Sequence, residues 1–283
     1  MTQVSGQTFT TKEEHVQGPG GLRLFVRSWH PGHNPRGVVV ICHGVNSHSG
    51  YYIWTAERLV ERGFAVYALD LPGRGKSDGE RFYVESIDEY IQAVDALVDL
   101  AKSREPALPL YLLGHSAGGV TSCVYTLEHQ AKLAGLICES FAFKVAAPDF
   151  ALQVVKGLSH IAPHIHILRL KNEDFSRDPE IVKFMNEDPL IAGEVQPTAT
   201  VAALTRADDR LDREFGLITL PVLILHGTAD KATNPKGSEQ FYAEAGSQDK
   251  TLKLYEGHAH DLLNDFDRDK VMGDIVEWLE ERV

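Results

Sequence analysis

The sequence is poor in cysteine and has no pattern in which cysteine or histidine commonly binds a metal. Its 283 residues include 3 cysteines, Cys42, Cys123 and Cys138, all in apolar segments, where a free thiol behaves as a small hydrophobic group. So few thiols give no disulfide framework, which favours a reducing compartment. Neither Cys-x-x-Cys nor His-Glu-x-x-His occurs, so the 13 histidines do not indicate a metal site, and no cofactor is predicted.

Long hydrophobic runs and an excess of basic residues are also missing. No stretch approaches the roughly 18 consecutive apolar residues of a membrane-spanning helix. The N-terminus lacks a basic region followed by an apolar one, so we expect no signal peptide and a cytoplasmic location. The 28 basic and 40 acidic residues give a net charge of −12, which argues against nucleic acid or an anionic membrane as partner. No internal repeat or low-complexity linker divides the chain, which indicates one large domain.

Apolar runs alternate with helix-like segments over most of the chain. We expect strands near residues 13–17, 21–29, 37–43, 64–69, 108–114 and 133–139, and helices near 50–62, 85–103 and 117–130. Such alternation predicts a mostly parallel sheet with helices on both faces. Between Ser140 and Leu220 the alternation fails, and an apolar stripe recurs at helical spacing. It consists of Phe150, Ala151, Val154, Val155, Leu158 and Ile161. This segment is expected to be a helical insertion whose stripe either packs on the core or faces an apolar ligand.

One serine lies in a context typical of a nucleophile. Gly114-His115-Ser116-Ala117-Gly118 follows an apolar run and precedes a helix-like stretch. Strand, sharp turn and helix are the setting in which Gly-x-Ser-x-Gly presents a hydroxyl above a sheet. The strained turn requires neighbours without side chains two residues away on either side, and Gly114 and Gly118 meet that demand. We therefore predict that Ser116 is a nucleophile.

A serine nucleophile needs a base, and the base needs a carboxylate that orients it. Two further strand-like runs lead into a loop with Asp230 and into a loop with His258 and His260. Because open α/β sheets place ligands at the carboxyl ends of their strands, these loops should meet at Ser116. We predict that Asp230 is the acid and that His260 is the base, since it has two residues of reach beyond the turn at Gly257.

Three other histidines compete less well for the role of base. His258 shares the loop of His260 and is expected to shape it. His226 lies at a strand end in the loop that already supplies the acid, and His115 points away from the serine in a turn of this kind. His115 is expected to pack, and His226 is expected either to pack or to support a residue of the site.

Acyl transfer also requires donors for the oxyanion of the tetrahedral intermediate. The backbone N–H of Ala117, directly after the nucleophile, supplies one. The loop after the strand at residues 37–43 should supply the second, and Val45 N–H is the candidate, because Gly44 lets the backbone approach the carbonyl closely.

Several further motifs carry a family resemblance. They are His43-Gly44, His48-Ser49, Tyr52, Asp70-Leu71-Pro72-Gly73-Arg74-Gly75-Lys76-Ser77, Gly79-Glu80-Arg81 and Asp188-Pro189-Leu190. With the Ser116, Asp230 and His260 loops, they make the chain resemble α/β-hydrolases of the monoacylglycerol lipase family, which is also grouped with lysophospholipases and serine aminopeptidase-like hydrolases. The chain departs from the family's usual pattern at Asn46-Ser47, where Gly-Glu is usual, and at Tyr51, where Arg is usual.

The resemblance implies an α/β-hydrolase fold with a sheet of about eight strands and a helical cap inserted after the sixth. The core would comprise residues 1–140 and 220–283 and the cap residues 141–219, with Leu152, Val155 and Leu158 as candidate acyl-chain contacts. It implies a serine carboxylester hydrolase that acts on small neutral single-chain esters, monoacylglycerols first, with transient contact between the cap and a lipid surface. Lysophospholipids or short-acyl esters are the alternative substrates. A non-catalytic binding protein of the same fold is the alternative class, and retention of all three triad residues argues against it.

Overall fold

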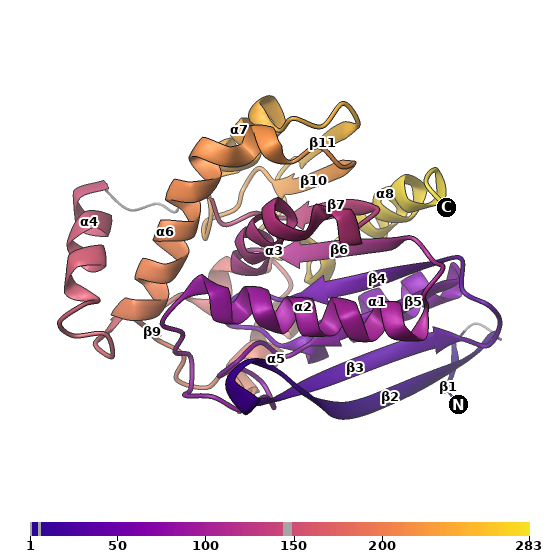
Figure 1. The fold of residues 1–283 in the computed structure, drawn as a ribbon, viewed down its shortest axis with the longest axis horizontal. Helices are drawn as coiled ribbons and strands as arrows, with labels where there is room; N and C mark the ends of the chain where they lie inside the picture. Colours follow the sequence, from indigo (N-terminus) through magenta and orange to yellow (C-terminus); the bar gives the residue numbers. More distant parts are fainter. Residues whose placement is uncertain (1, 5–6, 144–148) are drawn as a thin grey trace.

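The computed structural model describes residues 2–4, 7–143 and 149–283. Within these residues the main sheet has nine strands in the order β1-β2-β3-β5-β4-β6-β7-β10-β11 (Figure 1). The strands are β1 (Thr2–Val4), β2 (Gln7–Gln17), β3 (Arg23–Pro31), β4 (Gly37–Cys42), β5 (Phe64–Leu69), β6 (Leu110–His115), β7 (Gly135–Glu139), β10 (Val222–Gly227) and β11 (Lys250–Tyr255). The helices are α1 (Ile53–Glu61), α2 (Ile87–Arg104), α3 (Ala117–His129), α4 (Asp149–Leu158), α5 (Pro179–Glu187), α6 (Thr198–Glu214), α7 (Pro235–Glu244) and α8 (Arg268–Glu280).

The predicted mostly parallel sheet is confirmed. The six strands from β5 through β4, β6, β7 and β10 to β11 pair in parallel, whereas β1, β2 and β3 add an antiparallel edge. Parallel pairing brings the carboxyl ends of β4, β6, β10 and β11 to one edge of the sheet. The loops that carry the predicted oxyanion donor, nucleophile, acid and base therefore leave the sheet on the same side.

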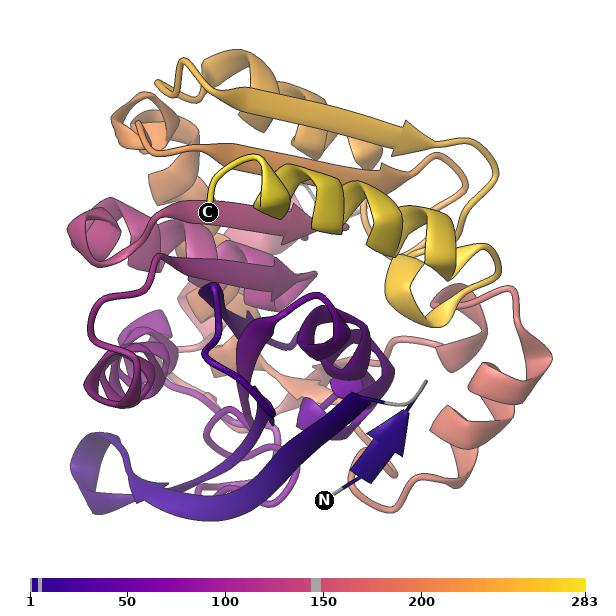
Figure 2. The same ribbon diagram turned by 90° about the vertical axis from the view of Figure 1, so that its right-hand side faces the viewer.

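Two hydrophobic clusters cover the two faces of the sheet. Along β4, Val38 and Val40 face one cluster and Val39 and Ile41 face the other, because successive side chains of a strand point to opposite faces. Helices α2 and α3 cover the first face, and α1 and α8 cover the second (Figure 2). Since both faces are buried, the central strands are apolar throughout rather than alternating.

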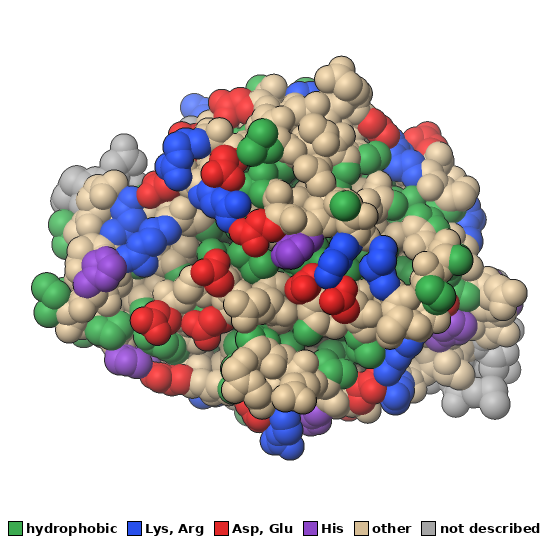
Figure 3. Space-filling view, in the orientation of Figure 1, with side chains coloured by type: hydrophobic (Ala, Val, Ile, Leu, Met, Phe, Trp, Pro, Cys, Tyr) green, Lys and Arg blue, Asp and Glu red, His purple; other side chains and the backbone are tan. Residues whose placement is uncertain are grey.

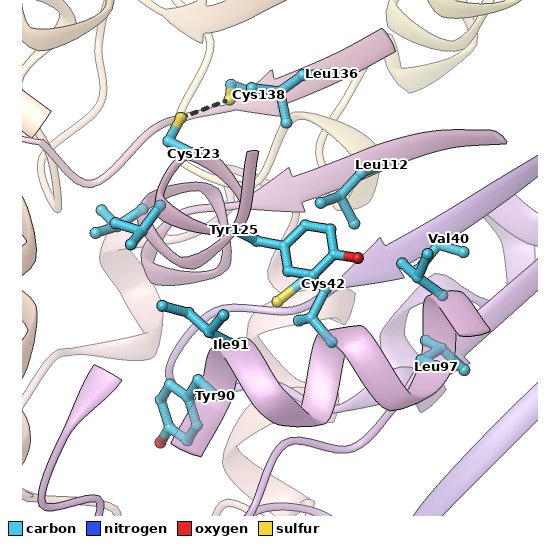
Figure 4. Close-up of a cluster of buried hydrophobic side chains, with 14 of the residues drawn as sticks. Val40, Cys42, Tyr90, Ile91, Leu97, Leu112, Cys123, Tyr125, Leu136 and Cys138 are labelled. Carbon is cyan, nitrogen blue, oxygen red and sulfur yellow. Dashed lines mark hydrogen bonds between the residues drawn. The ribbon is translucent and has the colours of Figure 1, made fainter. Parts of the chain in front are cut away.

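The cysteines lie in this core as the sequence predicted. All three are buried and free. Cys123 of α3 and Cys138 of β7 face each other with 3.5 Å between their sulfur atoms (Figure 4). That is a weak hydrogen bond between thiols, in the apolar environment that free cysteine favours.

The N-terminal edge is longer than expected. The predicted strand at residues 13–17 extends back to Gln7, and β1 precedes it. Antiparallel pairing from Phe9↔Pro31 to Gln17↔Arg23 holds the extra length. Phe9 is buried, but the threonines around it carry little hydrophobic signal, so backbone pairing with β3 largely decides the added length.

The segment between β7 and β10 forms the predicted insertion. It contains α4, α5 and α6 together with a two-stranded sheet of β8 (His166–Leu168) and β9 (Gln196–Pro197), which the sequence did not indicate. Helix α6 packs on α3 of the core and α4 packs on α6, as Figure 1 shows on its left side. In the part of the chain that the structure describes, no helix is both long enough and apolar enough to cross a membrane.

Candidate active site

Ser116 stands at a sharp turn between β6 and α3. Its backbone is in a positive-φ conformation, with φ 56° and ψ −122°, which is strained for a residue with a side chain. The flanking glycines make the turn possible. A Cβ on Gly114 would lie 2.5 Å from the carbonyl oxygen of Gly118, and one on Gly118 would lie 2.2 Å from that of Cys42. The Ser116 N–H donates to the Glu139 carbonyl over 2.9 Å, which fixes the turn against β7.

Asp230 and His260 form a buried pair. The distance between Asp230 Oδ2 and His260 Nδ1 is 2.7 Å, and neither side chain is exposed. Asp230 Oδ1 accepts the N–H groups of Ala232 and Thr233. Burial by itself would raise the pKa of Asp230, but the charge of His260 and the donors of His226, His260 and Thr233 hold it well below its usual range. Asp230 is therefore an anion that orients the His260 ring.

The other ring nitrogen of His260 is free to act on a neighbour. His260 Nε2 is buried and has no hydrogen-bond partner among the described residues. The ring packs against His115 and against the edge of Phe175, each with 4.9 Å between ring centroids. With Nδ1 donating to Asp230, the neutral ring has Nε2 as its acceptor, which is the arrangement that a general base requires.

Of the competing histidines, only His226 contacts Asp230 among the described residues. His258 Nε2 is 4.0 Å from Asp267 and its ring packs near Tyr255, away from Asp230. His226 is fully buried, with Nδ1 2.7 Å from Ser238 Oγ and Nε2 3.0 Å from Asp230 Oδ2. It is therefore a second partner of the Asp230 carboxylate, at the same Oδ2 atom that His260 contacts.

The loop after β4 places Val45 on the same cavity wall as Ser116. A Cβ on Gly44 would lie 2.8 Å from Ser116 Cβ, so only glycine permits this approach. His43 holds the Gly44–Val45 peptide. Its Nε2 accepts the Leu71 N–H over 2.9 Å, and its Nδ1 therefore donates to the Gly44 carbonyl over 2.7 Å. Burial lowers the pKa of His43 to about 4, which keeps it in this neutral form.

The family-specific motifs brace the same loop. His48 Nε2 lies 2.8 Å from Asp188 Oδ2, which joins the loop to the Asp-Pro-Leu motif of the insertion. Asp70 accepts the N–H of Ser49 over 2.7 Å and that of Lys76 over 2.7 Å. These motifs are therefore in contact in the folded protein, although His48 and Asp188 lie 140 positions apart in the sequence.

An apolar cavity of about 400 Å³ opens onto Ser116. Val45 and Ala117 share its wall with the serine, and most of the remaining wall comes from the insertion. The apolar side chains of the insertion on this wall are Leu152, Val155, Ile167, Leu168, Leu170, Phe175, Val201 and Leu204. Of the three acyl-contact candidates, Leu152 and Val155 lie on the wall, whereas Leu158 is half-buried outside it.

The rest of the predicted apolar stripe does not all face inward. Val154 of α4 is 62% exposed, so this helix turns one face to the cavity and another to solvent. Ile161, which follows the helix, is 85% exposed. Phe150 and Ala151, which the stripe also included, have side chains outside the described residues.

Glu139, Asp261 and His115 form a buried cluster behind the His260 ring. Their ligand atoms lie within 4.8 Å of one another. Burial and the charge of Asp261 raise the pKa of Glu139 well above its usual value, and burial raises that of Asp261 to about 6. Two carboxyls and an imidazole could hold a small cation, but the raised pKa of Glu139 favours the protonated form of that carboxyl, which is a poor ligand for a cation.

Sequence reasoning missed several residues of this site. Thr233 donates to Asp230 Oδ2 over 2.8 Å and lies 3.4 Å from His260 Nδ1. Its position three residues after the acid was the available signal. For Glu139 the signal was a carboxyl at the carboxyl end of an otherwise apolar strand. Asp261 had no signal beyond its place next to His260.

The fold and the Ser116 turn define an α/β-hydrolase. The model of the serine aminopeptidase, S33, family matches residues 33–267, and the chain therefore belongs to that family. It is 31% identical to the monoacylglycerol lipase of Mycolicibacterium smegmatis over 95% of this chain and 98% of that protein. It is 32% identical to the human monoglyceride lipase over 95% and 90%, respectively. The crystal structure of the monoacylglycerol lipase of Paleococcus ferrophilus superimposes with a TM-score of 0.83 at 32% identity, covering 92% of this chain and 99% of that one.

Proposed function

We propose that this chain is a serine carboxylester hydrolase that cleaves neutral single-chain acyl esters, with monoacylglycerols as the preferred class. One observation carries the proposal. A serine in a strained turn lies on the wall of an apolar cavity. Its neighbour His115 packs against the ring of His260, whose Nδ1 pairs with the buried Asp230 and whose Nε2 has no partner among the described residues. The names of the relatives support the substrate class.

The reaction follows from the roles of these groups. His260 Nε2 takes the proton of Ser116 as Oγ attacks the ester carbonyl carbon, and Asp230 holds the ring in the tautomer that can accept it. The N–H groups of Val45 and Ala117 stabilise the oxyanion. The intermediate collapses, the C–O bond to the alcohol breaks, and His260 returns its proton to the departing alcohol. Water repeats these steps on the acyl-serine and releases the fatty acid.

The insertion, residues 141–219, acts as a cap over the core formed by residues 1–140 and 220–283. Its contribution to the wall makes the cavity apolar, and each methylene of an acyl chain buried there gains about 0.8 kcal/mol. Leu152 and Val155 are the proposed chain contacts. Leu158 lies outside the wall, so we do not assign it a contact.

Lysophospholipid is the second candidate substrate, and one feature favours it. A surface cleft of about 680 Å³, lined largely by charged and polar residues, meets the apolar cavity at Asp174 and Lys231. Its wall includes Arg177 and Lys183 together with acidic side chains. A charged headgroup could lie in this cleft with the acyl chain in the cavity.

A substrate panel separates these candidates. The purified protein is assayed against p-nitrophenyl esters of graded chain length, 1-monoacylglycerols and lysophosphatidylcholine, with Ser116→Ala as the blank. We expect the highest kcat/KM on monoacylglycerols. A higher value on lysophosphatidylcholine would transfer the assignment to the second candidate. Absence of hydrolysis on every ester would reject the enzyme and favour a binding protein.

The cap also presents an apolar surface to solvent. Val154, Ile161 and Ile165 are exposed, and Figure 3 shows hydrophobic side chains at the end of the molecule formed by α4. We propose transient contact with a lipid surface through this end. Ile161→Ser should then reduce co-sedimentation with phosphatidylcholine vesicles, and unchanged co-sedimentation would count against the contact.

The three free thiols support the cytoplasm as the proposed compartment.

A further inference from the structure

The oxyanion loop, residues 43–48, is held by the insertion at Asn46. The Asn46 N–H donates to Glu194 Oε1 over 2.9 Å. Its side-chain Nδ2 donates to Asn172 Oδ1 over 3.0 Å. Asn46 has a φ of 49°, a left-handed conformation that asparagine tolerates better than most residues but does not prefer. These bonds hold the loop in a shape that it would not adopt by itself.

Glu194 is itself fixed inside the protein. It lies between α5 and β9 and is 5% exposed. Its Oε1 also accepts from Gln196 Nε2 over 2.7 Å and from the guanidinium of Arg74. Arg74 is 1% exposed and donates in addition to Tyr90 Oη over 3.0 Å and to Gln196 Oε1 over 2.8 Å. A buried ion pair of this kind adds little stability compared with apolar side chains of similar volume. We therefore attribute to it the positioning of the groups that it contacts.

Val45 lies between two fixed neighbours. On one side, Gly44 packs against Ser116 with no room for a side chain, and His43 holds its carbonyl. On the other side, Asn46 is held by Glu194. The residue before Val45 is therefore fixed by contacts with the core, and the residue after it is fixed by a hydrogen bond to the insertion.

We propose that Glu194 is a positioning residue for the oxyanion hole. Glu194 holds the Asn46 N–H, so that the neighbouring Val45 N–H points at the developing oxyanion. This proposal rests on the proposed function, in which Val45 is a donor. Gln196, two residues after Glu194, lies on the cavity wall. The segment that carries Glu194 therefore contacts both the oxyanion loop and the space for the acyl chain.

Two double variants test the proposal without leaving a buried charge unpaired. Arg74→Met with Glu194→Gln removes the ion pair but keeps an oxygen that can accept the Asn46 N–H. Arg74→Met with Glu194→Leu removes the acceptor as well. We expect kcat of the Leu pair to be lower than that of the Gln pair by about tenfold to 100-fold, with KM within about twofold, since loss of an oxyanion donor acts on the transition state.

A transition-state analogue provides a second readout. An alkyl boronic acid forms a tetrahedral adduct on a serine nucleophile, so its affinity should fall by the same factor as kcat. Asp209→Asn is the matched control, because Asp209 pairs with Lys156 inside the insertion and is not part of the cavity wall. Its kcat and boronate affinity should stay within about twofold of wild type.

Three results would overturn the proposal. The first is equal kcat and equal boronate affinity in the two double variants. The second is a rise in KM with unchanged kcat, which would assign Glu194 to substrate binding. If the Leu pair does not fold, Glu194→Asp replaces it, because aspartate keeps the charge opposite Arg74 but shortens the reach to Asn46. The third result that would overturn the proposal is a wild-type kcat in Glu194→Asp. Failure of the proposed function is distinct, since wild type itself would then not hydrolyse esters.

Discussion

A negative charge on the cavity wall should change the preference for acyl-chain length. In Val155→Asp, the carboxylate replaces an isopropyl group on the wall of the apolar cavity and draws water into the adjoining space. If three or four methylenes lose their apolar contact at about 0.8 kcal/mol each, the loss is about 2.4–3.2 kcal/mol. That corresponds to a fall in kcat/KM of roughly 50- to 200-fold for a laurate ester. An acetate ester does not reach this wall and should change by about twofold or less.

Helix α4 supplies its own comparison. Leu152→Asp should behave like Val155→Asp, because both side chains lie on the cavity wall. Leu158→Asp places the same charge on the same helix at a half-buried position outside the wall, so it should affect acetate and laurate equally. The assay is kcat/KM on p-nitrophenyl acetate, butyrate and laurate and on monolauroylglycerol. Equal losses for all chain lengths in Val155→Asp, or the same selectivity in Leu158→Asp, would refute the reasoning.

Three further predictions concern the site itself. Ser116→Ala should keep the wild-type Tm, lose on the order of 10⁴-fold in kcat and resist labelling by a fluorophosphonate; substantial remaining activity would reject Ser116 as the nucleophile. His260→Ala should cost about as much, because triad members act as a unit, whereas His258→Ala, whose ring lies near Asp267, should cost about tenfold or less; the reverse order would make His258 the base. Burial raises the pKa of Glu139 above its ordinary value of 4.5. Above pH 4.5 the unfolded chain therefore releases a proton that the folded protein keeps, and the stability of the wild type falls as the pH rises. Glu139→Gln carries no such proton, so its Tm relative to wild type should increase from pH 5 to pH 8, with up to about 1.4 kcal/mol gained per pH unit; a Tm difference independent of pH would contradict the protonated carboxyl.

The central strands and their order along the chain were predictable, because burial on both faces gives continuous apolar runs. Val38 to Ile41 illustrate this, since all four are fully buried although they face two different clusters. The β8–β9 pair was not predictable. His166–Leu168 is exposed whereas Gln196–Pro197 is buried. Strands of two or three residues that pair through backbone hydrogen bonds leave little trace in the hydrophobic pattern.

Local motifs predict the parts of the site that local structure builds. The Ser116 turn follows from glycines two residues away, and the spacing after Gly257 favoured His260, the ring that the structure places at Asp230. The contact between Asn46 and Glu194 spans 148 residues, and no local pattern signals it. Buried carboxyls such as Glu139 are equally silent, because the surroundings that shift their pKa come from distant segments.

The charges around the base follow from how many donors each carboxyl meets. Asp230 receives backbone N–H groups and hydroxyl and imidazole donors, so it remains an anion although it is buried. Glu139 Oε1 receives the Leu263 N–H, and its Oε2 has no partner among the described residues, so burial prevails and the group keeps a proton. The same low-polarity surroundings thus give one ionised carboxylate at Nδ1 of His260 and a protonated one behind its ring. In the proposed mechanism, Asp230 is therefore the carboxylate that pairs with Nδ1 of the imidazolium, which leaves the proton on Nε2 for the departing alcohol.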